Sequence, residues 1–327
     1  MTNFIQGRSL GLENRIRIGV SACLLGQPVR FDGSHKHDRY LTGTLGEYLE
    51  FVPVCPEVEA GFPIPRETFR LVGDPENPRF VTTRSQVDHT ERMAAWAEKR
   101  VRELETENLC GFIFKSDSPS SGLERVKVYN AKGMAEKKGV GMFARAFTRH
   151  FPLLPVEEEG RLNDAKLRET FIEQIFTLKR WRETLAQAAD MKRLVDFHTR
   201  HKLLVLAHSP AHAKLMGKLV AEGKRMPIRE VYTDYERLLI EALRLKTTLK
   251  KNMNVLQHIM GYFKQQLTAD EKQELLEVLD RYRKEYLPLI VPITLLNHYV
   301  RKYDQPYLKQ QVYLNPHPMA LKLRNHA

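Results

Sequence analysis

In RIRIGVSACLLG, residues 15–26, a short apolar run ends just before Cys23, and this pattern indicates the fold of the N-terminal part. The same arrangement recurs in FVPVCPE, residues 51–57, where Cys55 follows the run, and in GFIFKSDSPSSG, residues 111–122. Short apolar runs that alternate with helical segments predict an α/β domain with a parallel sheet. In such a sheet the loops at the carboxyl ends of the strands form the ligand crevice. We therefore expect these three loops to meet in one site.

The length and composition of the chain fit a soluble protein with two domains. The 327 residues are too many for one typical core, and we predict domains over 1–158 and 159–327. No apolar stretch reaches membrane-spanning length and the N-terminus has no signal-peptide pattern, so we expect a cytoplasmic protein. Three widely spaced cysteines argue against a disulfide framework and suit a reducing compartment. The oligomeric state stays open.

The net charge of +12 is concentrated in the C-terminal part of the chain. Residues 1–150 carry 22 Lys and Arg against 19 Asp and Glu, whereas residues 191–327 carry 24 against 13. A basic excess of this kind predicts a polyanionic partner such as RNA, or else only a well-solvated helical surface. Charge alone leaves both interpretations open.

The N-terminal part predicts helices over 39–50, 87–107 and 141–150 between its apolar runs. In the middle helix Ala94, Ala95, Val101 and Leu104 are candidates for the buried face. Three prolines within residues 61–77 indicate an irregular loop that covers the site. Residues 157–160 are the best candidate for a linker.

From Leu162 onward the strand signal disappears, and the pattern predicts an all-α helical C-terminal domain. The expected helices cover 164–188, 192–207, 210–222, 231–266, 269–285 and 291–302. In the helix expected over 231–266, an apolar stripe at steps of three and four is a packing seam. On another face of that helix, Arg237, Arg244 and Lys251 lie seven residues apart and predict an exposed basic ridge.

The cysteines do not form a local metal motif, because the spacings between them are 32 and 55 residues. A lone cysteine is most often a small buried core residue, but a site assembled from separate strand ends remains open for Cys23 and Cys55. Cys110 precedes the third apolar run, so five residues at about 3.3 Å each place it roughly 16 Å from the other two. Glu57 follows Pro56 and has a purely structural interpretation as a carboxylate at a helix start.

Several motifs together resemble a known family. VSACLLG (residues 20–26), VRFDG (29–33), CPE (55–57) and KSDSPSSG (115–122) resemble the TudS thiouracil desulfidase domain over about residues 15–155. FHTRHK (197–202), AHS (207–209), GYF (261–263), PLIVP (288–292) and QVYLNP (311–316) resemble the YbgA-type helical domain. Their order is that of the RudS family, which removes sulfur from 4-thiouridine in tRNA.

The resemblance implies a 4Fe-4S cluster held by three cysteines, with one iron open to the sulfur of a thiolated uracil base. Carried onto this sequence, Cys23 and Cys55 are two ligands, and Glu57 moves protons to and from the attacking water. Ser118 assists by hydrogen bonding or proton relay. The implied partner is tRNA that contains 4-thiouridine.

One position departs from the family pattern, because its third cysteine lies in Ser-Pro-Ser-Cys-Gly and this sequence has Ser121 there. A serine alkoxide is a harder and weaker ligand for iron than a thiolate. Three explanations follow: a variant with a weakened cluster, a site that uses Ser121 or another donor, or a protein that keeps the fold without the activity.

Basic and histidine side chains are candidates for contacts with substrate or RNA, by hydrogen bonding and by charge. The predicted set is Arg30, Lys115, Arg125, His201, Lys202, His208, Arg244 and Lys251. A zinc site formed by His198, His201, His208 and His212 is disfavoured, because Pro210 interrupts a continuous helix and no carboxylate or cysteine joins the set. Two alternatives to a tRNA desulfidase remain: a catalytically silent RNA-binding protein and a desulfidase for free thiouracil.

Overall fold

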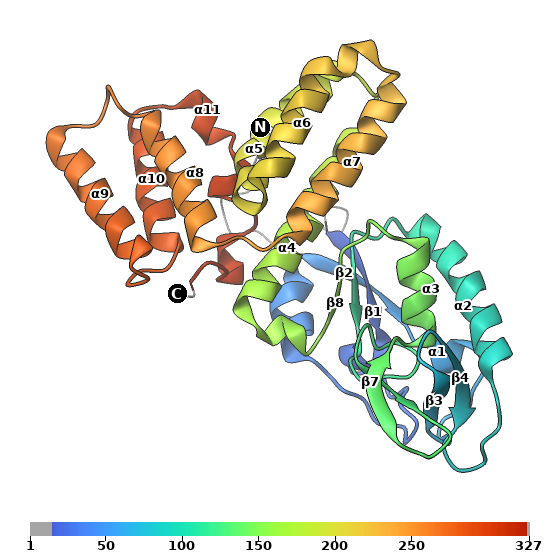
Figure 1. Cartoon of the computed structure of the whole chain (residues 1–327). Coiled ribbons are helices and arrows are strands. Elements are labelled where there is room, and N and C mark those ends of the chain that lie inside the picture. Colours follow the sequence, from blue (N-terminus) through green and yellow to red (C-terminus); the bar gives the residue numbers. More distant parts are fainter. Residues whose placement is uncertain (1–14, 326–327) are drawn as a thin grey trace. The chain divides into compact units, whose positions relative to one another are not determined.

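The computed structural model describes residues 15–325 and separates at Leu167 into two compact units (Figure 1). The N-terminal one, the α/β unit, contains all eight strands of the described chain, and the C-terminal one, the helical unit, contains none. The predicted fold class, an α/β domain followed by an all-α domain, is confirmed. None of the helices in the described range is both long enough and apolar enough to cross a bilayer.

The main sheet of the α/β unit contains the three apolar runs as parallel strands. Its order is β2 (Leu49–Val54), β1 (Ile16–Ser21), β5 (Phe112–Phe114) and β8 (Val156–Glu158). β1 lies between β2 and β5, so their carboxyl ends are neighbours, as predicted. Residues 157–160 are not a linker, because β8 pairs with β5 as the fourth strand. The buried Glu158 is satisfied there by the amide of Leu123, 2.7 Å from its Oε1.

Aromatic packing fixes the middle of this sheet. Phe112 and Phe114 stack with ring centroids 4.2 Å apart, and Phe147 of α3 (Met142–His150) lies 4.7 Å from Phe112. Gly19 on β1 leaves room for this cluster, because a Cβ there would lie 2.2 Å from the Phe112 ring. The helix predicted over 141–150 is therefore confirmed and covers β5.

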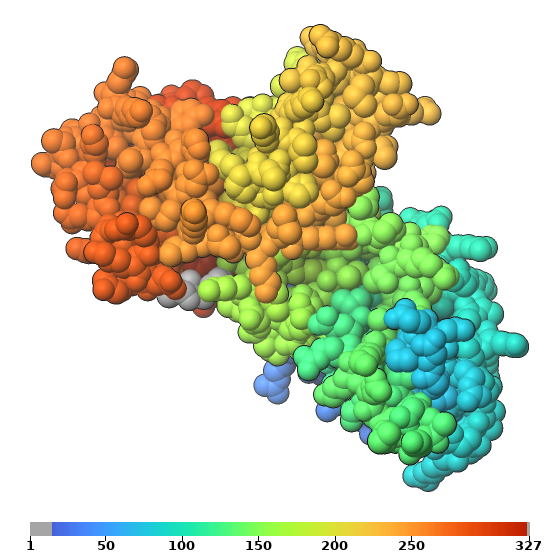
Figure 2. Space-filling view, viewed as in Figure 1, coloured from blue at the N-terminus to red at the C-terminus, as the bar shows by residue number. Residues whose placement is uncertain are grey.

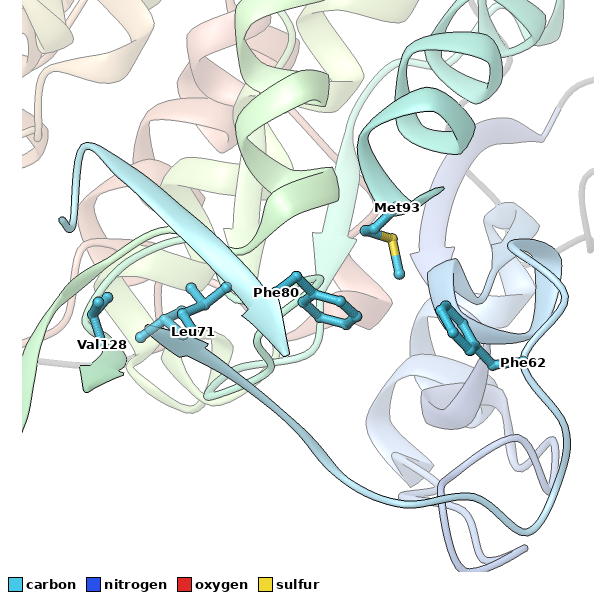
Figure 3. Close-up of a cluster of buried hydrophobic side chains, with 6 residues drawn as sticks. Phe62, Leu71, Phe80, Met93 and Val128 are labelled. Carbon is cyan, nitrogen blue, oxygen red and sulfur yellow. The ribbon is translucent and has the colours of Figure 1, made fainter. Parts of the chain in front are cut away.

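A second, mixed sheet was not predicted. Its order is β4 (Asn77–Thr82), β3 (Phe69–Asp74), β6 (Val126–Tyr129) and β7 (Ala135–Gly139). Figure 3 shows the apolar cluster in which Leu71, Phe80 and Val128 of this sheet lie toward Met93 of α2 (Thr90–Leu104) and Phe62. The prolines predicted one irregular loop over 61–77, but only the part before Phe69 is irregular, because β3 begins at that residue.

Two helices expected in the α/β unit differ in detail from the structure. α2 buries Met93, Ala97, Val101 and Leu104, whereas Ala95 is exposed. The predicted buried face is therefore right at Val101 and Leu104 and wrong at Ala95. The helix predicted over 39–50 is reduced to the short helical turns Tyr40–Thr44 and Leu45–Glu47, because β2 already begins at Leu49.

The helical unit packs around Trp181, whose ring lies 5.0 Å from Phe197 and 5.1 Å from Tyr235 between ring centroids. These three residues come from the first, second and fourth helices of the unit. The helices are α4 (Ala165–Leu185), α5 (Met191–His208), α6 (Pro210–Glu222), α7 (Ile228–Arg244), α8 (Leu249–Gly261), α9 (Ala269–Arg283), α10 (Ile290–Lys302) and α11 (Pro306–Lys309).

The single helix predicted over 231–266 was wrong, because the chain forms α7 and α8 with a break between them. Thr248 begins α8 as its N-cap and accepts a hydrogen bond from the amide of Lys251. The β-branched pair Thr247-Thr248 favours this interruption, since threonine competes for backbone hydrogen bonds. The predicted basic ridge therefore does not lie along one helix.

Candidate functional site

A cavity of about 230 Å³ opens at the carboxyl ends of β1, β2 and β5. The predicted residues Cys23, Cys55, Glu57, Ser118 and Ser121 all line it, together with Arg30 and Lys115. The prediction that the three loops meet is confirmed. Arg125, in contrast, is exposed and lies outside the lining of this cavity.

Cys23 and Cys55 reach the cavity from the ends of neighbouring strands. Cys23 lies in the helical turn Ala22–Leu25 directly after β1, where Gly26 takes the left-handed conformation that ends the turn. Cys55 is the N-cap residue of α1 (Pro56–Glu59), and its amide donates to Glu59 Oε1 at 2.8 Å. Pro56 suits the first position of α1, since no hydrogen bond from its nitrogen is needed there.

Both thiols are held neutral by their surroundings. Burial raises the pKa of Cys23 to about 11, and the nearby Lys115 only partly opposes this effect. Burial, with a further contribution from the Glu57 carboxylate, raises the pKa of Cys55 to about 12. Without a bound cation these side chains therefore remain thiols at neutral pH. A metal that binds thiolates would have to displace their protons.

Glu57 is the carboxylate of the cavity, and its two oxygens have different partners. Oε1 accepts a hydrogen bond from Ser120 Oγ at 2.7 Å. Oε2 lies 3.7 Å from Cys55 Sγ and 3.9 Å from Arg66 Nη2. The side chain of Arg66 is itself buried and donates to the carbonyl of Val29 at 2.9 Å. Glu57 is thus fixed by charge and hydrogen bonds rather than free to rotate into solvent.

The serine loop, residues 118–122, is folded tightly against the start of α3. The carbonyl of Ser120 accepts the amides of Phe143 and Ala144, at 2.8 and 3.2 Å. Gly141 permits this approach, because a Cβ there would lie 2.5 Å from the carbonyl carbon of Ser120. Ser118 Oγ closes the loop from inside by accepting the amide of Ser121 at 3.1 Å.

Ser120 is a site residue that the sequence reasoning missed. Its hydroxyl lies 3.0 Å from Ser118 Oγ and donates to Glu57, so it joins the predicted pair Ser118 and Glu57 into one chain of polar groups. The motif did contain Ser120, but only the folded loop reveals that its hydroxyl points to Glu57.

Lys115 has an intramolecular partner in the cavity wall. Its ammonium forms an ion pair with Glu159 and donates to the hydroxyl of Ser116, 2.9 Å away. The amide of Lys115 donates to Ser21 Oγ at 2.9 Å. Lys115 thus ties β5 to β1 and to the segment after β8, in addition to lining the cavity.

Cys110 lies where the sequence placed it, at the opposite end of β5. Its amide donates to the carbonyl of Arg17 at 2.8 Å, its side chain is buried, and it is absent from the cavity lining. It cannot replace the missing third thiol. Among residues 15–325, Ser121 therefore occupies the third position of the donor set, where its side chain is buried.

The donor set combines two soft sulfurs with one hard oxygen. Cys23, Cys55 and Glu57 do not form a group whose ligand atoms all lie within 4.8 Å of one another, as the ligands of one ion do. Two buried thiols offer the soft sulfur donors that suit iron in such clusters, and Ser121 offers a harder oxygen in third place. The residues present thus fit an iron-sulfur group, with a weaker third ligand than a cysteine would give.

Two histidines predicted to contact RNA are buried in the helical unit instead. His201 is 1% exposed, stacks on Phe197 with ring centroids 3.8 Å apart, and has a pKa well below its usual range, chiefly because of burial. His208 is fully buried between Glu173 Oε2, at 3.0 Å, and the carbonyl of Leu245, at 2.7 Å. These two predictions were wrong, because the helical spacing that suggested a polar surface belongs to the core.

The predicted RNA-contact cations of the helical unit also have structural contacts. Lys251 Nζ donates to the carbonyls of His208, at 2.6 Å, and Lys246, at 2.8 Å, so it caps the end of α5. The ammonium of Lys202 lies 5.0 Å from the centroid of the Tyr307 ring. Arg244 ends α7 and likewise has an intramolecular partner. Each of these three cations therefore has a contact within the chain, and the predicted RNA contacts stay predictions.

The histidines do not gather into a metal site. In the described chain, the group with ligand-like spacing outside the cavity is instead Glu169, Glu173 and His317. Arg324 already neutralises this group, with Nη2 2.7 Å from Glu173 and Nε 3.1 Å from Glu169. We interpret it as a buried ion-pair network that closes the C-terminal segment onto α4.

Comparison with known proteins assigns similarity to both parts of the chain. Residues 18–159 match the family model described as 2-thiouracil desulfurase, and residues 202–318 match a family described as a protein of unknown function, DUF1722. The chain is 27% identical over 165 residues to the uncharacterized protein YbgA of Escherichia coli (strain K12), which covers 50% of this chain and 98% of YbgA. It is 32% identical over 108 residues to the uncharacterized protein YbbK of Bacillus subtilis (strain 168), which covers 32% of this chain and 71% of YbbK.

A solved structure is also similar in sequence. The [4Fe-4S]-dependent thiouracil desulfidase TudS is 31% identical and covers 46% of this chain and 95% of its own, with a TM-score of 0.37. The two family matches confirm the fusion that the motifs indicated, a desulfurase-type part followed by a YbgA-like part.

Proposed function

Because the chain belongs to the 2-thiouracil desulfurase family, which residues 18–159 match, we propose that it replaces the sulfur of a thiolated uracil base with oxygen from water. The observation that carries the proposal is the cavity in which Cys23, Cys55 and Glu57 meet beside linked serine hydroxyls. The reaction converts C=S to C=O, consumes one water and releases sulfide. It therefore balances without an external oxidant or reductant.

The proposed cofactor is a 4Fe-4S cluster, which the name of the similar protein TudS states for that protein. Cys23 and Cys55 would hold it as thiolates, and Ser121 would supply an oxygen ligand. When bound, the cluster supplies an open iron site that takes a soft thione sulfur. Because both thiols are neutral in its absence, loading releases protons and is favoured by alkaline pH.

Glu57 is the proposed proton carrier. A carboxylate at hydrogen-bonding distance from an attacking water can accept its proton and later return one to the product. Ser120 fixes the carboxylate by donating to Oε1, and Ser118 in turn holds the loop that carries Ser120. Ser118 acts through this chain of hydroxyls, in which Ser120 stands between it and Glu57.

The proposed substrate is 4-thiouridine within tRNA, since the desulfurase-type unit is fused to a basic helical unit. A base that is to react must leave its stack, and a separate domain that grips the RNA backbone keeps the substrate bound while this happens. The buried histidines cannot provide that grip. The exposed cations of the α6–α7 hairpin are better placed for phosphate contacts.

We define the hairpin cations as the five exposed basic residues of α6, the turn after it and the start of α7: Lys214, Lys218, Lys224, Arg225 and Arg229. None of them forms an ion pair with any residue in the range 15–325. Other exposed arginines of the unit, such as Arg193 and Arg237, pair with acidic neighbours. Figure 2 shows the hairpin, in yellow to gold, projecting from the rest of the helical unit. Unpaired, projecting cations suit an electrostatic contact with phosphates.

The chemical proposal is tested by turnover in labelled water. Reconstituted protein is incubated anaerobically with 4-thiouridine in H₂¹⁸O, and the product is analysed by mass spectrometry. We expect uridine carrying one ¹⁸O and an equivalent amount of sulfide. A Cys55→Ala variant, which lacks one ligand, should form no uridine. Failure of the reconstituted wild-type protein to form labelled uridine from either 4-thiouridine or free thiouracil would refute the desulfidase function.

The tRNA proposal is tested separately by binding at several salt concentrations. Replacing Lys214, Lys218, Lys224 and Arg225 by Gln should weaken tRNA binding and flatten the salt dependence by roughly 0.7–0.9 per lost phosphate contact. A control variant removes three cations of and just after α9, two of which are ion-paired, in Lys272→Gln, Arg281→Gln and Lys284→Gln, and should change the slope little. If the wild-type protein processes free thiouracil but binds tRNA no better than the hairpin variant, the free-base alternative is correct.

A further inference from the structure

Phe31 is an aromatic residue at the cavity that the proposed chemistry does not use. It lines the cavity, and 36% of its surface is exposed. Its ring forms no ring-to-ring contact with any aromatic side chain in the range 15–325. Phe69, the other aromatic residue of the lining, stacks instead on Phe80 with centroids 4.5 Å apart and so belongs to the core. Phe31 is therefore the aromatic face of this cavity that is available to a ligand.

The backbone around Phe31 is held rigidly. The amide of Gly33 donates to the carbonyl of Arg30 at 3.0 Å, and Gly33 has a φ of 76°, which favours glycine. Asp32 Oδ1 accepts the amide and the hydroxyl of Ser34, at 3.0 and 2.6 Å. These hydrogen bonds fix the turn and therefore hold the Phe31 ring at the cavity.

Arg66 connects this turn to the reacting groups. Its amide donates to the carbonyl of Phe31 at 2.7 Å, while its guanidinium bonds the carbonyl of Val29 and lies 3.9 Å from Glu57. The Sγ atom of Cys55 lies 3.9 Å from the same carbonyl of Val29. The position of the Phe31 ring is thus coupled to the thiol and the carboxylate of the site.

The chemistry of this arrangement fits a flat base. An exposed aromatic ring on a fixed turn binds planar heterocycles by stacking, which depends little on the exocyclic atoms. The guanidinium of Arg30 lies over the Phe31 ring, 5.6 Å from its centroid, with its Nε 4.0 Å from Asp32 Oδ1, and adds a cation to the same surface. A cation beside the ring suits a nucleotide, because the sugar joins a negatively charged phosphate to the base.

We propose that Phe31 is the platform on which a uracil base stacks when it enters the cavity, with Arg30 beside it for the adjoining phosphate. This inference rests on the proposed function for the identity of the base. It adds that the site holds the base by its ring face, so that the product base binds the platform as the thiolated base does.

The test uses the full-length reconstituted chain and uridine 5′-monophosphate, which contains no sulfur and cannot be turned over. Base stacking on an aromatic side chain contributes about 1–3 kcal/mol, so Phe31→Leu should raise the dissociation constant about 5- to 150-fold. Phe31→Tyr should restore it to within about three-fold, because the planar ring is kept. Leucine preserves apolar volume, so a merely structural role would leave Phe31→Leu unaffected. Ile64→Ala, an exposed apolar residue of the neighbouring loop outside the cavity lining, is the matched control.

The outcomes separate this inference from the proposed function. Unchanged binding in Phe31→Leu, or no measurable binding by the wild-type protein, would overturn the platform even if 4-thiouridine were desulfurised. A selective loss in Phe31→Leu with recovery in Phe31→Tyr would support the platform even if the wild-type protein released no sulfide.

Discussion

Removal of the Ser120 hydroxyl should slow sulfur release without loss of iron. Ser120 Oγ donates to Glu57 Oε1 at 2.7 Å, and a hydrogen bond to a charged group contributes about 1.5–3 kcal/mol. If the full contribution is needed to hold Glu57 for proton transfer, Ser120→Ala lowers the rate by about 10- to 150-fold. Because the variant keeps both thiols, its iron content should equal that of the wild type.

The assay is single-turnover release of sulfide from 4-thiouridine, with the rate normalised to measured iron. Thr68→Val is the control, because Thr68 lines the cavity and its hydroxyl pairs with Thr83 at 2.9 Å rather than with Glu57. Glu57→Gln should keep iron and lose turnover. Adding Ser120→Ala to it should then cost little more, since the two groups act as a unit. A wild-type rate in Ser120→Ala, or fully additive losses in the double variant, would refute this reasoning.

Three further predictions concern stability and thiol reactivity. Arg324→Met leaves two buried carboxylates without their cation and should destabilise the helical unit by about 3–5 kcal/mol, which lowers its melting temperature by ~6–20 °C. Arg281→Met, on an exposed helix face, is the control and should change the melting temperature little. In iron-free protein at pH 8, Cys23 should react with iodoacetamide about 100-fold more slowly than a thiol of pKa 9, and the rate should rise until about pH 11. Because the pKa of Cys23 is raised on folding, its contribution to the free energy of unfolding is complete below pH 9 and is lost as pH rises through 11. Rapid labelling at pH 7 would contradict that burial. Gly141→Ala should lower the free energy of unfolding by about 1–3 kcal/mol, because its Cβ would meet the Ser120 backbone, while Gly43→Ala, with open space around it, should be neutral in urea titrations.

The sequence predicted the parts of the α/β unit whose signals are continuous. β1, β2 and β5 are short apolar runs buried in the main sheet, so their presence and the meeting of their loops could be predicted. β7 and the edge strand β4 gave no such signal, since β7 reads AEKKG and β4 contains Pro78. Their pairing depends on partners distant in sequence.

The errors in the helical unit share another cause. Helical spacing places His201 and His208 on a face, but it does not say whether that face is packed, and both side chains find buried hydrogen-bond partners. The break at Thr248 was equally hidden, because the apolar period continues across it. In the site, the direction of the Ser120 hydroxyl depends on the contact of its loop with α3. A local sequence pattern does not reveal such tertiary contacts, so these features could not be predicted.

The iron and sulfide content per chain after anaerobic reconstitution, compared between the wild-type protein and Ser121→Cys, tests whether Cys23, Cys55 and Ser121 hold a cluster. The proposed 4Fe-4S cluster predicts about four irons in both, with slower loss to a chelator from Ser121→Cys, because a thiolate is the better third ligand. Iron bound by Ser121→Cys but not by the wild-type protein would contradict the claim that Cys23, Cys55 and Ser121 complete a cluster site in this chain.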